Sequence, residues 1–407
     1  MSDRGYEGWR RNFYTLWAAE LTAIIGFQAM QPFLPYYIQE FDVGGLDQAL
    51  VWAGRMGTSA GLAMAVSAPV WGTLADRYGR KPMVVRSMLG GGLCVALMAY
   101  VPSVELLLLA RVLHGVLAGT VTACLTLVST STPRAHLAFA LGLMQGAFML
   151  GGSVGPLVGG PLIELFGYRH CFLVSGIVVM LAGLCVQLQV REDFQRSRSV
   201  ESSSRYRLPG RDMARLLSLR PFLVLVATVI SMSFAFGFIM PVVPLFLQQL
   251  AGARDILSLA GVIFGLGGLM GAVSSAVMGR FSDRLGPRRV LVGGLWAAAV
   301  LYLAQGFSTT VWALGTLIIF SGVATGSVRP VANSVLTRII DEEDRGKAFG
   351  VMSSMAALGW AFGPLAGSYL GAELGFRSVF YTTSVLFLIV GGWVWLATGR
   401  DRKGWNR

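Results

Sequence analysis

Long apolar segments separated by short polar segments recur along almost the whole chain. A bilayer core of roughly 30 Å needs about 20 apolar residues in a helix, and twelve segments meet this requirement. They cover approximately residues 13–38, 54–74, 83–101, 105–128, 138–161, 171–190, 221–249, 257–279, 290–307, 311–336, 347–370 and 376–398. Their unbroken apolar runs exclude a β-barrel, because barrel strands alternate between apolar and polar positions. The pattern predicts an all-α integral membrane protein with twelve transmembrane helices.

Composition supports the membrane class and excludes several functions. Hydrophobic residues make up 54% and charged residues 13% of the 407 residues, whereas soluble domains have roughly 25% charged residues. The three histidines form no metal-binding motif, and no nucleophile motif is present, which argues against a membrane enzyme. An ATP-driven pump is excluded because the chain lacks a Gly-x4-Gly-Lys-Ser/Thr motif. We expect no cofactor and no bound metal.

The distribution of positive charge predicts the orientation in the membrane. Of the 33 Lys and Arg residues, only Arg55, Arg169, Arg254 and Arg377 fall on loops of one side, and two more lie inside helices. The others fall on the opposite side, which the positive-inside rule identifies as the cytoplasm. Both termini are therefore predicted to be cytoplasmic. The net charge of +12 serves topology and contact with anionic lipids rather than nucleic-acid binding.

The chain is a duplicated six-helix unit. Landmarks recur at an offset of about 208 residues, including Gly155-Pro156 against Gly363-Pro364 and Gly167 against Gly375. A polar segment rich in Ser and Arg lies between the two copies. We therefore predict an N-terminal six-helix bundle over residues 1–190, a cytoplasmic linker over 191–220 and a C-terminal bundle over 221–407. Six helices per copy give both copies the same orientation. One chain contains both halves, so a monomer is expected to be sufficient.

A charged loop between the second and third predicted helices has the sequence GTLADRYGRKP, and GRFSDRLGPRR repeats its pattern in the second half. Glycines allow a tight turn and close backbone approach, and an aspartate can face the positive end of a helix. The basic residues can pair with acidic groups or anionic lipid. The positions concerned are Gly72, Asp76, Arg77, Gly79, Arg80 and Lys81, with Asp283 and Arg284 in the second copy. The loop serves either as a latch between the halves or only to hold topology.

These motifs resemble those of the major facilitator superfamily, and the resemblance covers essentially the whole chain. The loop at Gly72–Lys81 looks like the signature loop of that superfamily. The sequence GGSVGPLVGG in the fifth predicted helix is similar to the antiporter motif of its twelve-helix drug:proton antiporters. Arg111-Val-Leu-His-Gly115 resembles the arginine motif of the same group. The resemblance implies two six-helix bundles that alternate access to a central cavity, with the charged loop as a cytoplasmic latch.

The glycine-rich sequence of the fifth predicted helix also has a direct physical meaning. Small residues four positions apart allow two helices to approach closely. Proline removes a helix hydrogen bond and can bend the helix. The residues are Gly151, Gly155, Pro156, Gly159 and Gly160. They serve either ordinary tight packing or, as in the family, a bent helix that prevents leak while the halves move.

Ionisable residues inside a bilayer are costly and are candidates for function. Glu20 lies well inside the first predicted helix, and at 100° per residue it falls within about 80° of Gln28 and Gln31. This face is predicted to line the cavity. Glu20 is a candidate proton carrier and a counter-ion for a cationic substrate. The alternative is a fixed ion pair or a carboxyl group at the headgroup edge.

Two arginines lie inside predicted helices. By resemblance Arg111 tunes the proton site, whereas the alternative is a buried arginine that fixes helix geometry. Arg329 lies at a depth similar to that of Glu20, on the same face as Asn333. Because the family implies that the first, fourth, seventh and tenth helices line the cavity, we expect Glu20 and Arg329 to face each other.

The sequence therefore predicts a secondary transporter. The leading hypothesis is proton-coupled efflux of lipophilic, often cationic drugs from the plasma (inner) membrane of a bacterium. Its partners are a small-molecule lipophilic substrate, protons and membrane lipids, without nucleic acid. The alternative is efflux of a sugar, a metabolite or a lipid-like molecule by the same fold. A channel is a further possibility, although the doubled bundle favours alternating access.

Overall fold

The computed structural model describes residues 8–192, 219–252, 256–340 and 344–399. Most of the predicted linker, residues 193–218, lies outside the described residues. The described first half consists of α1 (Trp9–Met30), the 3-10 turn η2 (Gln31–Phe33), α2 (Leu34–Ile38), η3 (Gln39–Phe41), α3 (Leu46–Tyr78), α4 (Lys81–Leu97), α5 (Val104–Leu117), α6 (Thr120–Ser131) and α7 (Arg134–Gln189). The second half consists of α9 (Arg220–Ile239), α10 (Val242–Ala251), α11 (Ile256–Leu285), α12 (Pro287–Gly306), α13 (Val311–Gly326), α14 (Val328–Ile339), α15 (Arg345–Leu374) and α16 (Phe376–Gly399).

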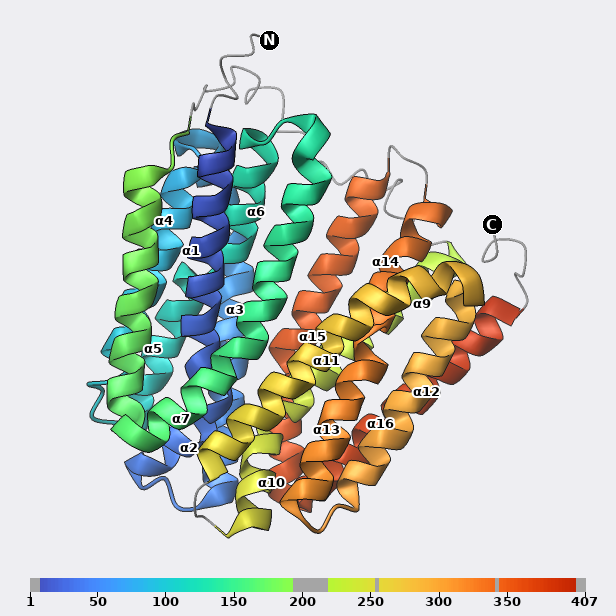
Figure 1. Ribbon diagram of the computed structural model, residues 1–407. Coiled ribbons are helices and arrows are strands. Elements are labelled where there is room, and N and C mark those ends of the chain that lie inside the picture. The colour runs from blue at the N-terminus through green and yellow to red at the C-terminus, as the bar shows by residue number, and fades with distance from the viewer. Residues whose placement is uncertain (1–7, 193–218, 253–255, 341–343, 400–407) are drawn as a thin grey trace. The chain divides into compact units, whose positions relative to one another are not determined.

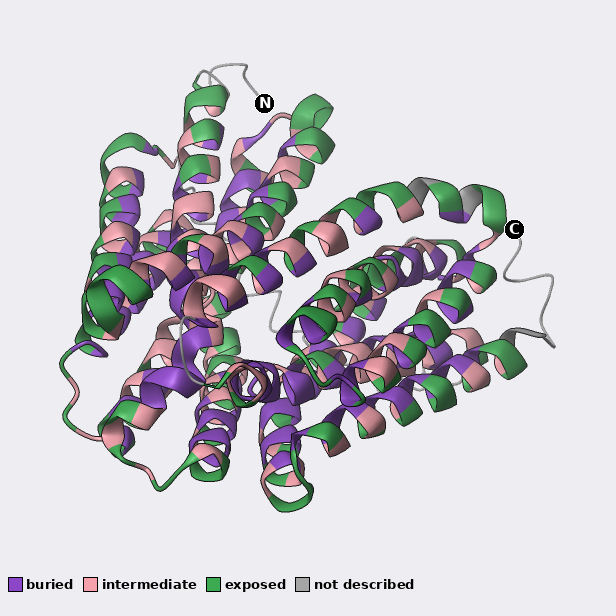
Figure 2. Ribbon diagram, turned by 60° about the horizontal axis from the view of Figure 1, so that its bottom comes forward, coloured by how far each residue is buried: buried purple, intermediate pink, exposed green. Residues whose placement is uncertain are grey.

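All twelve predicted segments are mostly helical, and the described residues contain no strand. Eight helical stretches in the described part of the chain are long and apolar enough to cross a membrane. One of them is α7, which contains two predicted segments joined at Gly167, where the backbone is not helical (φ 78°, ψ 165°). Large apolar side chains such as Leu165, Leu188 and Trp312 are more than 70% exposed. Figure 2 shows exposed positions scattered along the helices of both halves, as expected where lipid is the surrounding solvent.

Four of the predicted helices are interrupted rather than continuous. The first is divided by η2, which contains Pro32, and the seventh is divided into α9 and α10 at Pro241. The fourth is divided into α5 and α6 at Gly119, and the tenth into α13 and α14 at Ser327. The last two positions are 208 residues apart, so the interruption is part of the duplicated unit. These four helices are the ones that the family resemblance assigns to the cavity.

The same helix pairings occur in both halves. In the first half α1 packs along α7, and α4 packs along another part of α7. In the second half α9 packs along α15, and α12 packs along α16 (Figure 1). Corresponding segments of the two copies thus have corresponding neighbours. The repeat in the sequence is therefore accompanied by a repeat of the helix–helix contacts.

The chain divides into two compact units. Unit 1 contains Met1–Gly45, Arg55–Ser197 and Asp255–Gly265, and unit 2 contains Leu46–Gly54, Arg198–Arg254 and Leu266–Arg407. Each unit is one six-helix copy with a short segment from the other half added. The two exchanged segments are the beginnings of α3 and α11, the second helix of each copy. The sequence predicts one bundle over residues 1–190 and another over 221–407. It does not predict that the beginnings of α3 and α11 are grouped with the opposite half.

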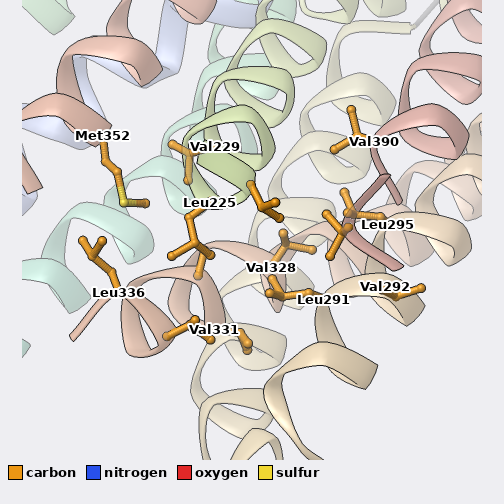
Figure 3. Packing of buried hydrophobic residues seen from close by; sticks show 14 of the residues in the cluster. Leu225, Val229, Leu291, Val292, Leu295, Val328, Val331, Leu336, Met352 and Val390 are labelled. Carbon is orange, nitrogen blue, oxygen red and sulfur yellow. The ribbon is translucent and has the colours of Figure 1, made fainter. Parts of the chain in front are cut away.

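Each unit has its own hydrophobic core. The core of unit 1 is built around Leu16 of α1 and Met88 of α4, both fully buried. In unit 2, Leu225, Leu291 and Val328 come together from α9, α12 and α14, as Figure 3 shows. Burial of such side chains contributes about 25 cal/mol per Å² in water, but between helices in lipid the stabilisation comes mainly from close packing.

Candidate functional site

A cavity of about 240 Å³ lies inside unit 1, between the end of α1 and the junction of α5 with α6. Most of its wall is apolar and is formed by Ile24, Phe27, Met30, Leu34, Met64 and Phe172. Gln28 and Gln31 of α1 and Arg111 of α5 also line it, as do Gly119 and Thr120 at the junction. The cavity is thus an apolar chamber with polar groups gathered on α1, α5 and the start of α6.

Arg111 is the charged group of this cavity. It is only 8% exposed, and its Nη2 donates a hydrogen bond of 3.0 Å to Oε1 of Gln31. His114, one turn further along α5, meets the ring of Phe27 edge to face with centroids 5.2 Å apart. No Asp or Glu belongs to the lining. The Arg111 guanidinium therefore has a neutral partner in the described residues.

Glu20 lies on α1 but does not border the cavity. Its side chain is fully buried, and neither carboxylate oxygen has a hydrogen-bond partner in the described part of the chain. Burying a charged carboxylate without a partner is strongly unfavourable, so this arrangement favours the neutral acid. Gln31, the partner of Arg111, is eleven residues further along, or about 16 Å at 1.5 Å per residue. Glu20 and Arg111 form no ion pair.

The glycines of the fifth predicted helix bring α7 into close contact with α1. A Cβ atom at Gly151 would lie 2.8 Å from Ile24 Cβ, and one at Gly155 would lie 2.7 Å from Gln28 Cβ. A Cβ at Gly159 would collide with the backbone of Ala29. The close approach that the spacing predicts is therefore present. Gln28 therefore lies against the glycine stripe formed by Gly151, Gly155 and Gly159, so that a movement of α7 would also move Gln28.

The remaining glycine of this motif makes a different contact. A Cβ at Gly160 would collide with the backbone of Leu257, at the start of α11, which belongs to unit 1. Pro156 lies inside α7 without ending it, and its carbonyl oxygen lies against Gly261. One face of α7 thus holds α1, and another holds the exchanged segment of α11.

The charged loop is fixed to the end of α7 by Glu192, which belongs to none of the sequence motifs described above. The carboxylate of Glu192 accepts hydrogen bonds of 2.8 Å from the backbone N–H groups of both Arg80 and Lys81, at the start of α4. A carboxylate at a helix N-terminus satisfies free N–H groups and interacts favourably with the helix dipole. Lys81 Nζ in turn donates to Gln187 O at 2.8 Å. Only the position of Glu192, directly after an apolar segment, could have indicated this role.

The glycines of this loop differ from each other. Gly79 has φ +98°, in the left-handed region that favours glycine, and ends α3. The close approach expected at Gly72 is absent, because a Cβ atom there would meet no atom within 4 Å. Asp76 and Arg77 are exposed, and the Arg77 guanidinium lies over the ring of Tyr78. The N-terminus of α4 is thus capped by Glu192 and not by Asp76. That Asp76 faces the N-terminus of another helix stays a prediction.

The second copy of the loop keeps one of these bonds. Arg288 Nη2 donates to Trp395 O at 2.8 Å, as Lys81 does to Gln187 in the first copy. Both residues of the pair are shifted by about 208 positions. Arg284 is exposed, and the side chain of Asp283 lies outside the described residues. A cation that joins this loop to the last helix of the copy is therefore common to both halves.

Comparison with known proteins shows the family. The model of the Major Facilitator Superfamily matches residues 16–284 and 225–407. The chain belongs to this superfamily. The two matches overlap and together cover both copies, in agreement with the duplicated structure. Members of this superfamily are multi-pass membrane transporters, so the chain belongs to a family of transporters and not to a family of enzymes.

Several relatives in the superfamily resemble the chain over nearly its full length. Multidrug resistance protein MdtG of Escherichia fergusonii is 32% identical over 397 residues, which cover 97% of this chain and 96% of that protein. The protein of the same name in Enterobacter lignolyticus is 32% identical over 382 residues, which cover 93% and 90%.

Two solved structures show the same fold. A bacterial homologue of the human lysosomal transporter Spinster, in an inward-facing and unoccupied conformation, has a TM-score of 0.80 and 16% identity, with 99% of each chain covered. The human organic anion transporter MFSD10 (TETRAN) has a TM-score of 0.67 and 19% identity, with 95% of this chain and 99% of that chain covered. At such identities the likeness concerns the fold alone.

The predicted site residues of the second half lie in unit 2. Arg329 and Asn333 are both on α14, after the interruption of the tenth helix, and both side chains are exposed. Arg329 is thus not buried in unit 2 as Arg111 is buried in unit 1. That Arg329 faces Glu20 stays a prediction.

Proposed function

We propose that this member of the major facilitator superfamily exports lipophilic compounds, cationic drugs among them, in exchange for protons. The names of the relatives, which cover nearly the whole chain at 32% identity, support drug export. The apolar wall of the cavity supports a lipophilic substrate, because recognition of a sugar requires many hydrogen-bonding groups. Efflux of a sugar is accordingly the less favoured alternative.

The observation that carries the coupling proposal is the environment of Glu20. An acidic residue that is fully buried within a membrane helix, without a partner, is stable when protonated. It becomes a proton donor when a conformational change brings water or a cation to it. A group with these properties can take up a proton on one side of the membrane and release it on the other. Glu20 is the proton-carrying residue in this proposal.

Export then follows from alternating access of the two halves. Protonation of Glu20 favours the conformation in which it is buried, and a bound substrate favours another. A difference of a few kcal/mol between the states is sufficient to shift such an equilibrium. The Glu192 contact with the charged loop and the glycine contact between α1 and α7 keep helices of unit 1 together during the change.

The proposal includes the location and assembly of the protein. The chain resides in the inner membrane of a bacterium with both termini in the cytoplasm, where its basic loops contact anionic lipid. Because a single chain contains both six-helix copies, a monomer is the functional unit.

Transport by purified protein in proteoliposomes tests this proposal. A fluorescent lipophilic cation is followed under an imposed pH gradient, for the wild type and for Glu20→Gln. Glutamine keeps the shape of the side chain but cannot carry a proton, so we expect gradient-driven movement of the dye to be lost. Glu105→Gln, which removes an exposed carboxylate at the start of α5, is the matched control and should retain transport.

Three results can be distinguished. Loss of gradient-driven transport in Glu20→Gln alone supports the proposal. Unchanged transport in Glu20→Gln keeps drug export but removes Glu20 as the proton carrier. Failure of the wild type to move lipophilic cations or neutral compounds under any gradient favours the alternative of a sugar, metabolite or lipid-like substrate.

A further inference from the structure

The fourth transmembrane helix is broken at the cavity, and the break leaves hydrogen-bonding groups on both sides. Helix α5 ends at Leu117, Ala118 is extended (φ −64°, ψ 177°) and Gly119 is left-handed (φ +114°) before α6 begins at Thr120. The end of a helix leaves carbonyl groups without helical partners, and the start of a helix leaves N–H groups without them. Within a membrane such groups need partners from elsewhere.

Two of the carbonyl groups at the break have side-chain partners. Trp71 Nε1 of α3 donates to Val116 O at 2.6 Å, and Arg86 Nη2 of α4 donates to Ala118 O at 3.3 Å. The guanidinium of Arg86 also lies over the indole of Trp71, 3.6 Å from the ring centroid. The two side chains therefore support each other as well as the break. We call Trp71 and Arg86 the brace.

The free N–H groups on the other side of the break have no such partners. The first-turn N–H groups of α6, at residues 120–122, have no acceptor within the helix. Among the described residues no side chain accepts from them, and the Thr120 hydroxyl donates to Ser87 Oγ at 3.0 Å. Residues 119–122 line the cavity. The cavity thus receives the positive end of a helix of twelve residues.

Arg111 supplies an independent indication at the same cavity. It is 92% buried, its Nε has no hydrogen-bond partner, and its Nη2 binds the neutral Gln31. A buried guanidinium is costly unless an anion pairs with it. Glu20 is three helical turns away along α1, and no Asp or Glu lines the cavity. The cavity is therefore provided with N–H donors and positive charge, and its lining contains no anionic side chain.

We propose that this end of the cavity is a subsite for the carboxylate group of a lipophilic substrate. Arg111 and the first-turn N–H groups of α6 bind the carboxylate, and the apolar wall holds the apolar group next to the carboxylate. Trp71 and Arg86 are positioning residues, because they hold the break that directs α6 toward the cavity. The inference rests on the proposed export function and extends its substrates to lipophilic acids and zwitterions.

The size of the cavity agrees with part of a substrate. Ligand pockets usually measure about 300–1,000 Å³, and this one measures about 240 Å³. It therefore accepts a carboxylate with an adjacent apolar group, not a whole drug-sized molecule. The alternative is a structural role, in which Arg111 only joins α5 to α1 through Gln31. A structural Arg111 would affect all ligands alike.

Three probes with one fluorophore distinguish a carboxylate subsite from a structural arginine. They are dansyl-aminohexanoic acid, its methyl ester, and dansylcadaverine, which ends in an ammonium group. Binding to the purified full-length protein in detergent is followed by dansyl fluorescence. We expect the wild type to bind the acid at least about tenfold more tightly than the ester, because hydrogen bonds between charged groups are the strongest ones.

Variants then assign the preference to residues. Arg111→Gln should weaken binding of the acid about tenfold or more and change binding of the ester less than about twofold. Arg111→Lys, which keeps the charge, should recover part of the loss. Trp71→Phe keeps an aromatic ring at this position but removes the N–H donor, and should weaken binding of the acid about threefold. The exposed Arg134→Gln is the matched control and should change neither.

The inference is overturned if the wild type binds the acid no more tightly than the ester, and this comparison needs no variant to fold. It is also overturned if Arg111→Gln loses affinity for the acid and the ester equally. In either case proton-driven transport of the ester or of dansylcadaverine by the wild type leaves the export proposal standing. Absence of all transport removes the export proposal, while the ratio of the two affinities still decides the inference.

Discussion

Replacing Gly155 by alanine tests how closely α1 and α7 pack. The added Cβ would lie 2.7 Å from Gln28 Cβ and 3.0 Å from both Gln28 C and Ala29 N. Because carbon atoms in contact prefer separations of about 3.5–4.0 Å, the helices would have to move apart by roughly 0.5–1 Å. The atoms that must move belong to the backbone of α1, so a change of rotamer cannot relieve the overlap. Overpacking of this kind typically costs about 1–3 kcal/mol.

The same motif offers a matched control. At Gly152 the nearest atom to an added Cβ is Gln28 Nε2 at 3.9 Å, an ordinary van der Waals separation. Gly152→Ala should therefore leave stability unchanged or raise it slightly, since alanine favours helix. The assay is the loss of monodisperse protein on heating in detergent, followed by size-exclusion chromatography. We expect Gly155→Ala to lower the apparent melting temperature by several degrees relative to Gly152→Ala.

Equal melting temperatures for Gly155→Ala and Gly152→Ala would refute this reasoning. They would mean that α1 and α7 separate without cost, so that the glycine stripe does not determine their distance. A larger effect at Gly152 than at Gly155 would mean that the two helices face each other through a different side of α7.

Three further predictions concern single residues. Glu192→Gln should reduce stability by roughly 0.5–2 kcal/mol, because it weakens the cap of α4, and chemical denaturation in detergent should detect the change. Gly79→Ala places a side chain at φ +98° and should cost roughly 1–2 kcal/mol in the same assay, whereas Gly72→Ala, in open space, should cost nothing. Thr228→Val should retain gradient-driven dye transport, unlike Glu20→Gln, although Thr228 occupies the matching position of the second copy. Loss of transport in Thr228→Val would contradict that expectation.

The twelve segments of the fold could be predicted because the length of an apolar segment is a strong signal in a membrane protein. The interruptions of four of them could not. An interruption of two or three residues hardly changes the mean hydropathy of a segment of twenty or more. Pro32 and Gly119 lie at two of the breaks, but proline and glycine are also tolerated within continuous membrane helices. The sequence contains Pro32 and Gly119, but whether they interrupt a helix depends on the neighbouring helices, which the sequence does not show.

The candidate site was only partly predictable for a related reason. Helical periodicity placed Gln28 and Gln31 on one face of the first helix, and both line the cavity. The same periodicity placed Glu20 toward that face, but packing buries it away from the cavity. The brace was missed because the contact of Trp71 with Val116 joins residues 45 positions apart, which no pattern within one helix indicates. Tertiary geometry decides such contacts.

Comparison of the two copies separates packing from chemistry. Gly151, Gly155 and Gly159 recur 208 residues later as Gly359, Gly363 and Gly367, and added Cβ atoms there would meet the backbone of α9 as the first set meets α1. The ionisable residues proposed to carry the proton and to bind the carboxylate do not recur. At the same offset Glu20 corresponds to Thr228, whose buried hydroxyl donates to Val224 O of its own helix at 2.8 Å, and Arg111 corresponds to Ile319. The duplicated framework therefore fixes how the helices pack, whereas the groups proposed to carry the proton and to bind the carboxylate belong to the first copy alone.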